Sequence, residues 1–175
     1  MSGQQHCYPY PRPALTVDAI IVAQTAPPQL LLIQRKHNPF AGSWALPGGF
    51  VDSGEGLEAA AARELQEETS VDPSTVLLTQ VGAFGEPGRD PRGWTITVAF
   101  AALVPSTQLG VKAADDAQAA EWFPADRLPA LAFDHKLVVR TALRHLATQP
   151  DVAKQPALVG ALWAAAERLD GPWQQ

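Results

Sequence analysis

Three glutamates close together in the sequence are the side chains best suited to chemistry in this chain. Glu64, Glu67 and Glu68 lie within a run of strong helix formers. Spacings of three and four residues bring side chains to one face of a helix, so the three carboxylates are expected to meet there. Arg63 can offset only one of these charges. A divalent cation is the simplest balance, and oxygen ligands favour Mg²⁺, Mn²⁺ or Ca²⁺ over zinc.

A helix from residue 56 to about 69 is predicted to carry these glutamates. Leu57, Ala61 and Leu65 fall on one apolar stripe at helical spacing, which indicates that this face packs on a core. A loop with Pro47 and two glycines leads toward the helix, and its backbone can approach a ligand closely. The sequence therefore predicts a glycine-rich loop and a helix that together form one site.

Loop and helix together resemble the Nudix box, G-x5-E-x7-R-E-U-x-E-E-x-G-U, in which U is an apolar aliphatic residue. Ser70 departs from the pattern, because the box has glycine there. This position lies just past the helix end, where a left-handed backbone is usual, and serine adopts it at a cost of roughly 1 kcal/mol. We expect a slightly strained helix end and an intact site. The matching residues are Gly49, Glu55, Arg63, Glu64, Leu65, Glu67, Glu68 and Val71.

The resemblance implies a fold, a reaction and a set of ligands. Nudix enzymes hydrolyse a nucleoside diphosphate linked to another group, and their fold is an α/β/α sandwich with a mixed β-sheet. The cofactor implied is Mg²⁺, with Mn²⁺ as a substitute. Arg63 would hold the glutamates in place, and Glu64 would also orient the attacking water. The implied metal ligands are the Gly49 carbonyl, Glu64, Glu67 and Glu68, with Glu55 completing the shell or steadying the loop.

Family members often take a further acidic residue from outside the box as the base. Glu121, Asp115 and Asp116 are considered for this role, and the sequence does not rank them. We group Glu121 with Arg63, Glu64 and Glu68 as the catalytic set. The alternative for each of the three acidic residues is a solvated loop charge or a salt bridge.

Two segments outside the box, together with residues 44–51, resemble the branch of the family that contains bacterial ADP-ribose pyrophosphatases and ADP-ribose-sensing transcription regulators. The two segments are residues 85–93 and 131–135. The expected substrate is therefore ADP-ribose, cleaved to AMP and ribose 5-phosphate. Asp134 would cap a helix, although His135 beside it could orient substrate. The residues expected to bind substrate are Arg35, Arg89 and Arg92, as donors to diphosphate or ribose, and Phe40, Trp44 and Phe133, as an adenine pocket.

These side chains also have simpler structural interpretations, and the chain has alternative functions. The aromatic residues could be core packing, and Arg89 could be exposed to solvent. A sanitising hydrolase of oxidised nucleoside triphosphates would use the same box. A regulator would need a winged helix, and only about 25 residues follow Gln149. An inert binding module would lack box glutamates, and none is missing.

Length and composition limit the number of domains, the class of partner and the cellular location. A chain of 175 residues with 46% hydrophobic residues suits one domain, and the net charge of -5 argues against a nucleic-acid partner. The single Cys7 fits a reducing, cytoplasmic location, and neither a secretory signal nor a stretch that could enter a membrane is evident. A homodimer would be consistent with exposed aromatic residues. We expect an arm at 1–13, a hydrolase domain at 14–149, and a helix at 150–175 that packs on the domain or forms a tail.

Hydrophobic patterning and turn residues place the remaining elements around the box. Residues 94–104 become wholly apolar, which is typical of a central strand. Residues 115–120 are expected to be a polar connection, and Trp163 is expected on the apolar side of the last helix. Strands are predicted at 14–23, 29–36, 76–86, 94–104 and 121–124, and helices at 134–148 and 156–169.

Overall fold

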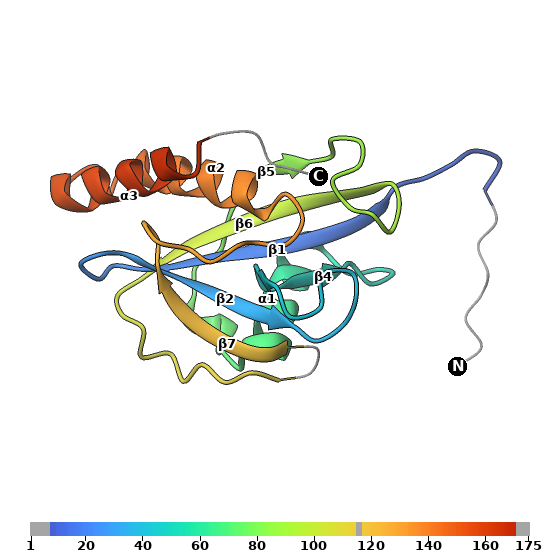
Figure 1. Ribbon diagram of the computed structural model, residues 1–175, viewed down its shortest axis with the longest axis horizontal. Helices are drawn as coiled ribbons and strands as arrows, with labels where there is room; N and C mark the ends of the chain where they lie inside the picture. The colour runs from blue at the N-terminus through green and yellow to red at the C-terminus, as the bar shows by residue number, and fades with distance from the viewer. Residues whose placement is uncertain (1–7, 115–116, 171–175) are drawn as a thin grey trace.

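One mixed β-sheet with helices on both of its faces organises the chain (Figure 1). The computed structural model describes residues 8–114 and 117–170, and within them the sheet has seven strands. No helix of this part of the chain is long and apolar enough to cross a bilayer. The predicted α/β/α sandwich is confirmed. The strands are β1 (Ala14–Ala23), β2 (Gln29–Arg35), β3 (Trp44–Ala45), β4 (Gly48–Phe50), β5 (Thr79–Phe84), β6 (Thr95–Val104) and β7 (Ala117–Pro124), and the helices are α1 (Leu57–Thr69), the 3-10 turn η1 (Pro73–Thr75), α2 (His135–Ala147) and α3 (Pro156–Arg168).

β1 and β6 form the centre of the sheet. They run parallel, from Ala14 opposite Thr95 to Ala23 opposite Val104. β6 also pairs with β5, and β1 pairs with β4 and with the start of β2. β2 continues the sheet to β3 and β7. Nearly continuous apolar runs suit strands that are covered on both faces, and the prediction of a central strand at 94–104 is confirmed.

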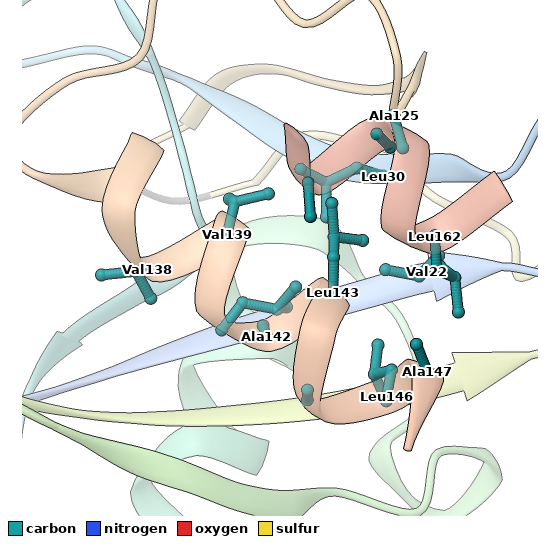
Figure 2. Packing of buried hydrophobic residues seen from close by; sticks show 14 of the residues in the cluster. Val22, Leu30, Ala125, Val138, Val139, Ala142, Leu143, Leu146, Ala147 and Leu162 are labelled. Atoms are coloured by element: carbon teal, nitrogen blue, oxygen red, sulfur yellow. The ribbon is translucent and has the colours of Figure 1, made fainter. Parts of the chain in front are cut away.

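Alternate residues of β1 separate two apolar cores, one on each face of the sheet. Val17, Ala19 and Ile21 belong to the core beneath α1, whereas Ile20 and Val22 belong to the core beneath α2. α3 packs on α2, so these two helices form the outer layer on one side (Figure 1). Figure 2 shows the core on that side, where Val138, Val139, Ala142, Leu143, Leu146 and Ala147 of α2 and Leu162 of α3 lie close to Val22, Leu30 and Ala125.

Three local predictions are wrong. Residues 117–120 are the first half of β7 rather than a polar connection, because their backbone pairs with β2. Trp163 is 39% exposed, and the guanidinium of Arg144 lies 5.8 Å from its ring centroid. Asp134 stands at the N-cap of α2 but makes no side-chain capping bond, since its carboxylate accepts hydrogen bonds from Arg89 instead.

Ser70 ends α1 in a left-handed conformation, with φ of 59°, and its N–H donates to the carbonyl of Gln66. We expect Ser70→Gly to leave stability unchanged or to raise it by up to about 1 kcal/mol, because glycine relieves the strain but adds entropy to the unfolded chain. Urea unfolding followed by circular dichroism measures this. Ser53→Gly is the control, since Ser53 does not have a positive φ. A clear loss of stability in Ser70→Gly alone would contradict this account of the helix end.

Candidate active site

A pocket of about 410 Å³ lies between α1, β4 and the end of β2. A hollow of about 50 Å³ adjoins it, and the two share Arg35, Gly48, Gly49 and Arg92 in their walls. The structure thus brings the box glutamates together with two of the predicted substrate-binding arginines. The pocket is lined by Ile33, Arg35, Lys36, His37, Gly48, Gly49, Phe50, Asp52, Arg63, Glu64, Glu67, Glu68 and Arg92.

Arg63 is the centre of the carboxylate cluster. Its guanidinium donates to Glu55 at 2.9 Å, to Glu64 at 2.8 Å and to Glu67 at 3.0 Å. A further donor reaches the carbonyl of Phe50 at 3.1 Å. These charge-assisted bonds, the one to Glu55 above all, raise the pKa of Arg63 above its usual value. The guanidinium therefore stays charged and holds three carboxylates in place.

Glu55 ties the loop before α1 to this arginine. Its carboxylate accepts from two nitrogen atoms of Arg63 and from the backbone N–H of Asp52 at 3.1 Å. The bond with Arg63 holds the pKa of Glu55 below its usual range. Of the two roles predicted for Glu55, these contacts support the steadying of the loop.

Glu68 is the buried member of the cluster. Its side chain lies against the loop, where Oε2 accepts the backbone N–H of Gly48 at 2.9 Å. The residue is only 8% exposed, and burial raises the pKa of Glu68 to about 8, although the bond from Gly48 opposes the shift. Burial also raises the pKa of Glu64. Carboxylates that have lost this much hydration gain more from a nearby cation than exposed ones do.

The donor atoms around Glu68 fit a divalent cation by their chemistry. Gly49 lets the loop backbone reach the cluster, because a Cβ at that position would lie 2.5 Å from Oε1 of Glu64. The backbone and the glutamates offer only oxygen atoms, which Mg²⁺ prefers. Among the residues that the structure describes, no three acidic, histidine or cysteine side chains are grouped as a metal site. Glu64 and Glu67 instead face Arg63, which sets their present arrangement.

In protein stripped of divalent cations, we expect stability to fall as pH rises. The pKa of Glu68 is about 8 in the folded chain against an ordinary value of 4.5, so its contribution is complete below pH 4.5 and lost as pH rises through about 8. The expected slope is about 1.4 kcal/mol per pH unit within that window. Urea unfolding with a chelator and with saturating Mg²⁺ measures the loss and its recovery. An equal slope in Glu68→Gln would refute the assignment to this carboxylate.

The ring of Phe133 lines the smaller hollow and is surrounded by a wall of rings and guanidinium groups. The guanidinium carbons of Arg35 and Arg92 lie 4.9 Å and 5.4 Å from its ring centroid. Phe40 meets the same ring edge-to-face at 4.8 Å, and Arg92 also lies 4.8 Å from the ring of Phe50. Both Phe40 and Phe133 have a positive φ, of 63° and 53°. Such a wall suits an aromatic base and a diphosphate.

Arg89 serves both the fold and the site, whereas Trp44 serves the fold alone. Arg89 lines the smaller hollow, but it is 4% exposed and donates to Asp134 at 2.9 Å and 2.7 Å. Solvent exposure of Arg89 is therefore excluded. Trp44 packs edge-to-face on Phe123, with ring centroids 4.6 Å apart, and lines neither pocket. Its position agrees with the core-packing alternative.

The structure does not bring Glu121 to the glutamates. Glu121 is exposed on β7 and pairs with Leu32, whose side chain belongs to the core beneath α2. Residues directly opposite each other on paired strands point to the same face, so Glu121 points away from α1. Asp115 and Asp116, also considered as the base, lie outside the described residues.

The sequence did not reveal Asp18, a buried acid that lies beside His135, the residue considered above for orienting substrate. Asp18 accepts from the hydroxyl of Thr97 at 2.7 Å, and its other oxygen lies 3.4 Å from Nε2 of His135. Nδ1 of His135 accepts the backbone N–H of Leu46 at 3.0 Å. Burial lowers the pKa of His135, which keeps the ring neutral and Nδ1 free to accept. An acidic residue inside an apolar strand is the signal that could have revealed Asp18.

Comparisons with known proteins cover the residues that build both pockets. A family model described as NUDIX domain matches residues 12–145. The chain is 45% identical over 135 residues to the ADP-ribose pyrophosphatase of Methanocaldococcus jannaschii, which covers 77% of this chain and 76% of that protein. It is 39% identical over 142 residues to the ADPR responsive transcriptional repressor NtrR of Acinetobacter baylyi, covering 78% of this chain and 56% of the repressor. A solved NUDIX domain of Shewanella oneidensis NrtR complexed with ADP ribose matches with a TM-score of 0.70 at 35% identity, over 78% of this chain and 90% of that chain.

Proposed function

This chain belongs to the Nudix family of hydrolases, and we propose that it cleaves ADP-ribose to AMP and ribose 5-phosphate. The observation that carries the proposal is that Arg35 and Arg92 line both pockets. The glutamates line the larger pocket, and the ring of Phe133, which both guanidinium groups approach, lines the smaller hollow. A diphosphate held there would extend from the carboxylates toward an aromatic surface. The likeness to an ADP-ribose pyrophosphatase supports the same substrate.

The metal ligands proposed are the Gly49 carbonyl, Glu64, Glu67 and Glu68. They would hold Mg²⁺, for which Mn²⁺ would substitute. When bound, the cation neutralises charge on the diphosphate and lowers the pKa of the attacking water. Glu64 lines the pocket, and its carboxylate is held by a hydrogen bond from Arg63, which suits it to orienting that water.

Substrate binding is assigned to Arg35 and Arg92, which line both pockets, and to Phe133, which lines the smaller hollow. Asp90 fixes the guanidinium of Arg92, accepting from its Nε at 3.0 Å and its Nη2 at 2.7 Å. Arg35 is held by the carbonyl of Pro39, which accepts from its Nε at 2.8 Å. Guanidinium groups fixed in this way bind a diphosphate with less loss of side-chain entropy. The adenine ring would lie against Phe133.

A nucleotide panel tests the reaction and the substrate together. AMP and other products are measured by chromatography after incubation with ADP-ribose, NADH, diadenosine polyphosphates, flavin adenine dinucleotide or oxidised deoxyguanosine triphosphate, with Mg²⁺ or with a chelator. We expect Mg²⁺-dependent release of AMP, fastest from ADP-ribose. Preference for the triphosphate would keep the reaction and overturn the substrate. Hydrolysis that is unchanged by the chelator would overturn the metal.

A regulatory binding protein is the second candidate, because the repressor NtrR is among the proteins that this chain resembles. Tight binding of ADP-ribose without hydrolysis of any nucleotide would favour it over an enzyme.

We propose no nucleic-acid partner. The single Cys7 supports a reducing, cytoplasmic location. Trp94, which is 56% exposed and lines neither pocket, suits a homodimer, for which light scattering is the test.

A further inference from the structure

The loop between β3 and β4 joins the two faces of the sheet at the active site. Val17 and Ala19 point toward α1, so Asp18 between them points toward α2. Glu64 and Glu68, by contrast, belong to α1 on the opposite face (Figure 1). Gly48 pairs with Asp18 along the strand and donates its N–H to Glu68. A displacement of the loop backbone would therefore shift groups on both faces of the sheet.

His135 holds the start of this loop from the α2 side. Its Nδ1 accepts the N–H of Leu46, which is 2% exposed, across 89 positions of the sequence. The ring proton is consequently on Nε2, which faces Asp18 at 3.4 Å. Asp18 is itself held by Thr97. The imidazole is thus oriented at both nitrogen atoms, one toward the loop and one toward β1.

The far end of the loop is packed too closely to accommodate a side chain. A Cβ at Gly48 would overlap the carbonyl oxygen of Val17, and one at Gly49 would lie 2.5 Å from Oε1 of Glu64. Buried backbone packed this closely transmits a displacement rather than absorbing it. A shift at Leu46 would therefore move the N–H of Gly48 relative to Glu68.

We propose that His135 is a positioning residue for the cluster of Glu64 and Glu68, because its acceptance of the Leu46 N–H sets where the loop meets both carboxylates. The inference rests on the proposed function, since it takes these glutamates as metal ligands. It concerns affinity for the cation and is independent of which nucleotide is cleaved. Loss of an outer hydrogen bond of this kind typically weakens metal affinity by about 10–100-fold.

Two substitutions of His135 separate its two contacts. In His135→Asn the side-chain oxygen occupies the place of Nδ1 and can still accept from Leu46, whereas the contact with Asp18 is lost. In His135→Gln the amide reaches toward Asp18, and the acceptor for Leu46 is lost. Mn²⁺ binding without nucleotide is measured by electron paramagnetic resonance and calorimetry. We expect the Kd to rise about tenfold or more in His135→Gln and to stay within about threefold in His135→Asn.

Val139→Ala provides the matched control for general damage to α2. Val139 is fully buried in the core on the same helix and is not part of either pocket wall. It should lower the melting temperature without changing the Kd for Mn²⁺. Equal weakening in both His135 variants, or weakening in Val139→Ala as well, would overturn the proposal in favour of simple packing. An unchanged Kd in His135→Gln would also overturn it.

Hydrogen exchange in the wild-type chain tests the same link if a variant fails to fold. Coupling is reciprocal, so a cation that depends on the Leu46 hydrogen bond must also stabilise it. Mg²⁺ should slow exchange of the Leu46 amide more than that of Leu162 in α3, and equal effects would overturn the proposal. A wild-type chain that binds no Mn²⁺ would refute the metal site and this inference together. Mn²⁺ binding that weakens only in His135→Gln, with no cleavage of ADP-ribose, would refute the substrate alone.

Discussion

Glu68→Gln is expected to lower kcat for ADP-ribose by on the order of 10³-fold while leaving the fold intact, because a metal ligand contributes several kcal/mol to the transition state. Glutamine keeps the shape of the side chain and can still accept the N–H of Gly48. It removes the negative charge that a cation requires. Steady-state kinetics at saturating Mg²⁺ with circular dichroism of the same sample measures both effects.

Glu58→Gln is the control for this substitution, since Glu58 lies in the first turn of α1 and is exposed. Its kcat should match that of the wild type. Without cations at about pH 8, Glu68→Gln should be more stable than the wild type, because burial raises the pKa of Glu68 to about 8 and its charged form is costly. A Glu68→Gln enzyme with near-normal kcat would show that this carboxylate is not a ligand.

Arg89→Met is expected to lower the free energy of unfolding by about 3–5 kcal/mol, because it leaves the buried carboxylate of Asp134 without its partner. The pair is joined by two hydrogen bonds, and the side chains are 4% and 2% exposed. Methionine keeps most of the volume of arginine, so the loss would come from the charge rather than from a cavity. Urea unfolding at about pH 7 measures the difference.

Lys154→Ala gives the scale for an ion pair in water. Lys154 and Asp151 are 74% and 93% exposed, and breaking their contact should cost about 0–1 kcal/mol. Asp134→Asn added to Arg89→Met should recover part of the lost stability, since it removes the stranded charge. If Arg89→Met lowers the free energy of unfolding no more than Lys154→Ala does, the buried pair of Arg89 and Asp134 does not stabilise the fold as expected.

Local patterns were sufficient where one element sets its own structure. The stripe of Leu57, Ala61 and Leu65 predicted α1 and the face that it buries, and all three contact the core beneath it. Ser70 was expected to take the left-handed conformation because helix ends have few alternatives, and its φ of 59° agrees. The apolar run at 94–104 similarly predicted a central strand.

Features that depend on distant partners were not accessible in the same way. The alanine-rich start of β7 has weak strand preference, and only pairing with β2 makes it a strand. The same pairing turns Glu121 away from α1, which no spacing along the chain could reveal. Asp18 and His135 are 117 positions apart in the sequence and meet only because β1 and the start of α2 pack together.

Phe133, Asp134 and His135 are consecutive, yet each anchors a different part of the site. Phe133 contacts the arginine wall, Asp134 binds Arg89, and His135 holds Leu46. A library that varies the ring at position 133 can therefore explore nucleotide preference while both neighbours keep their partners. An insertion or deletion within 131–135 would misalign all three anchors at once. We therefore expect new substrate specificity to arise here by substitution rather than by insertion or deletion.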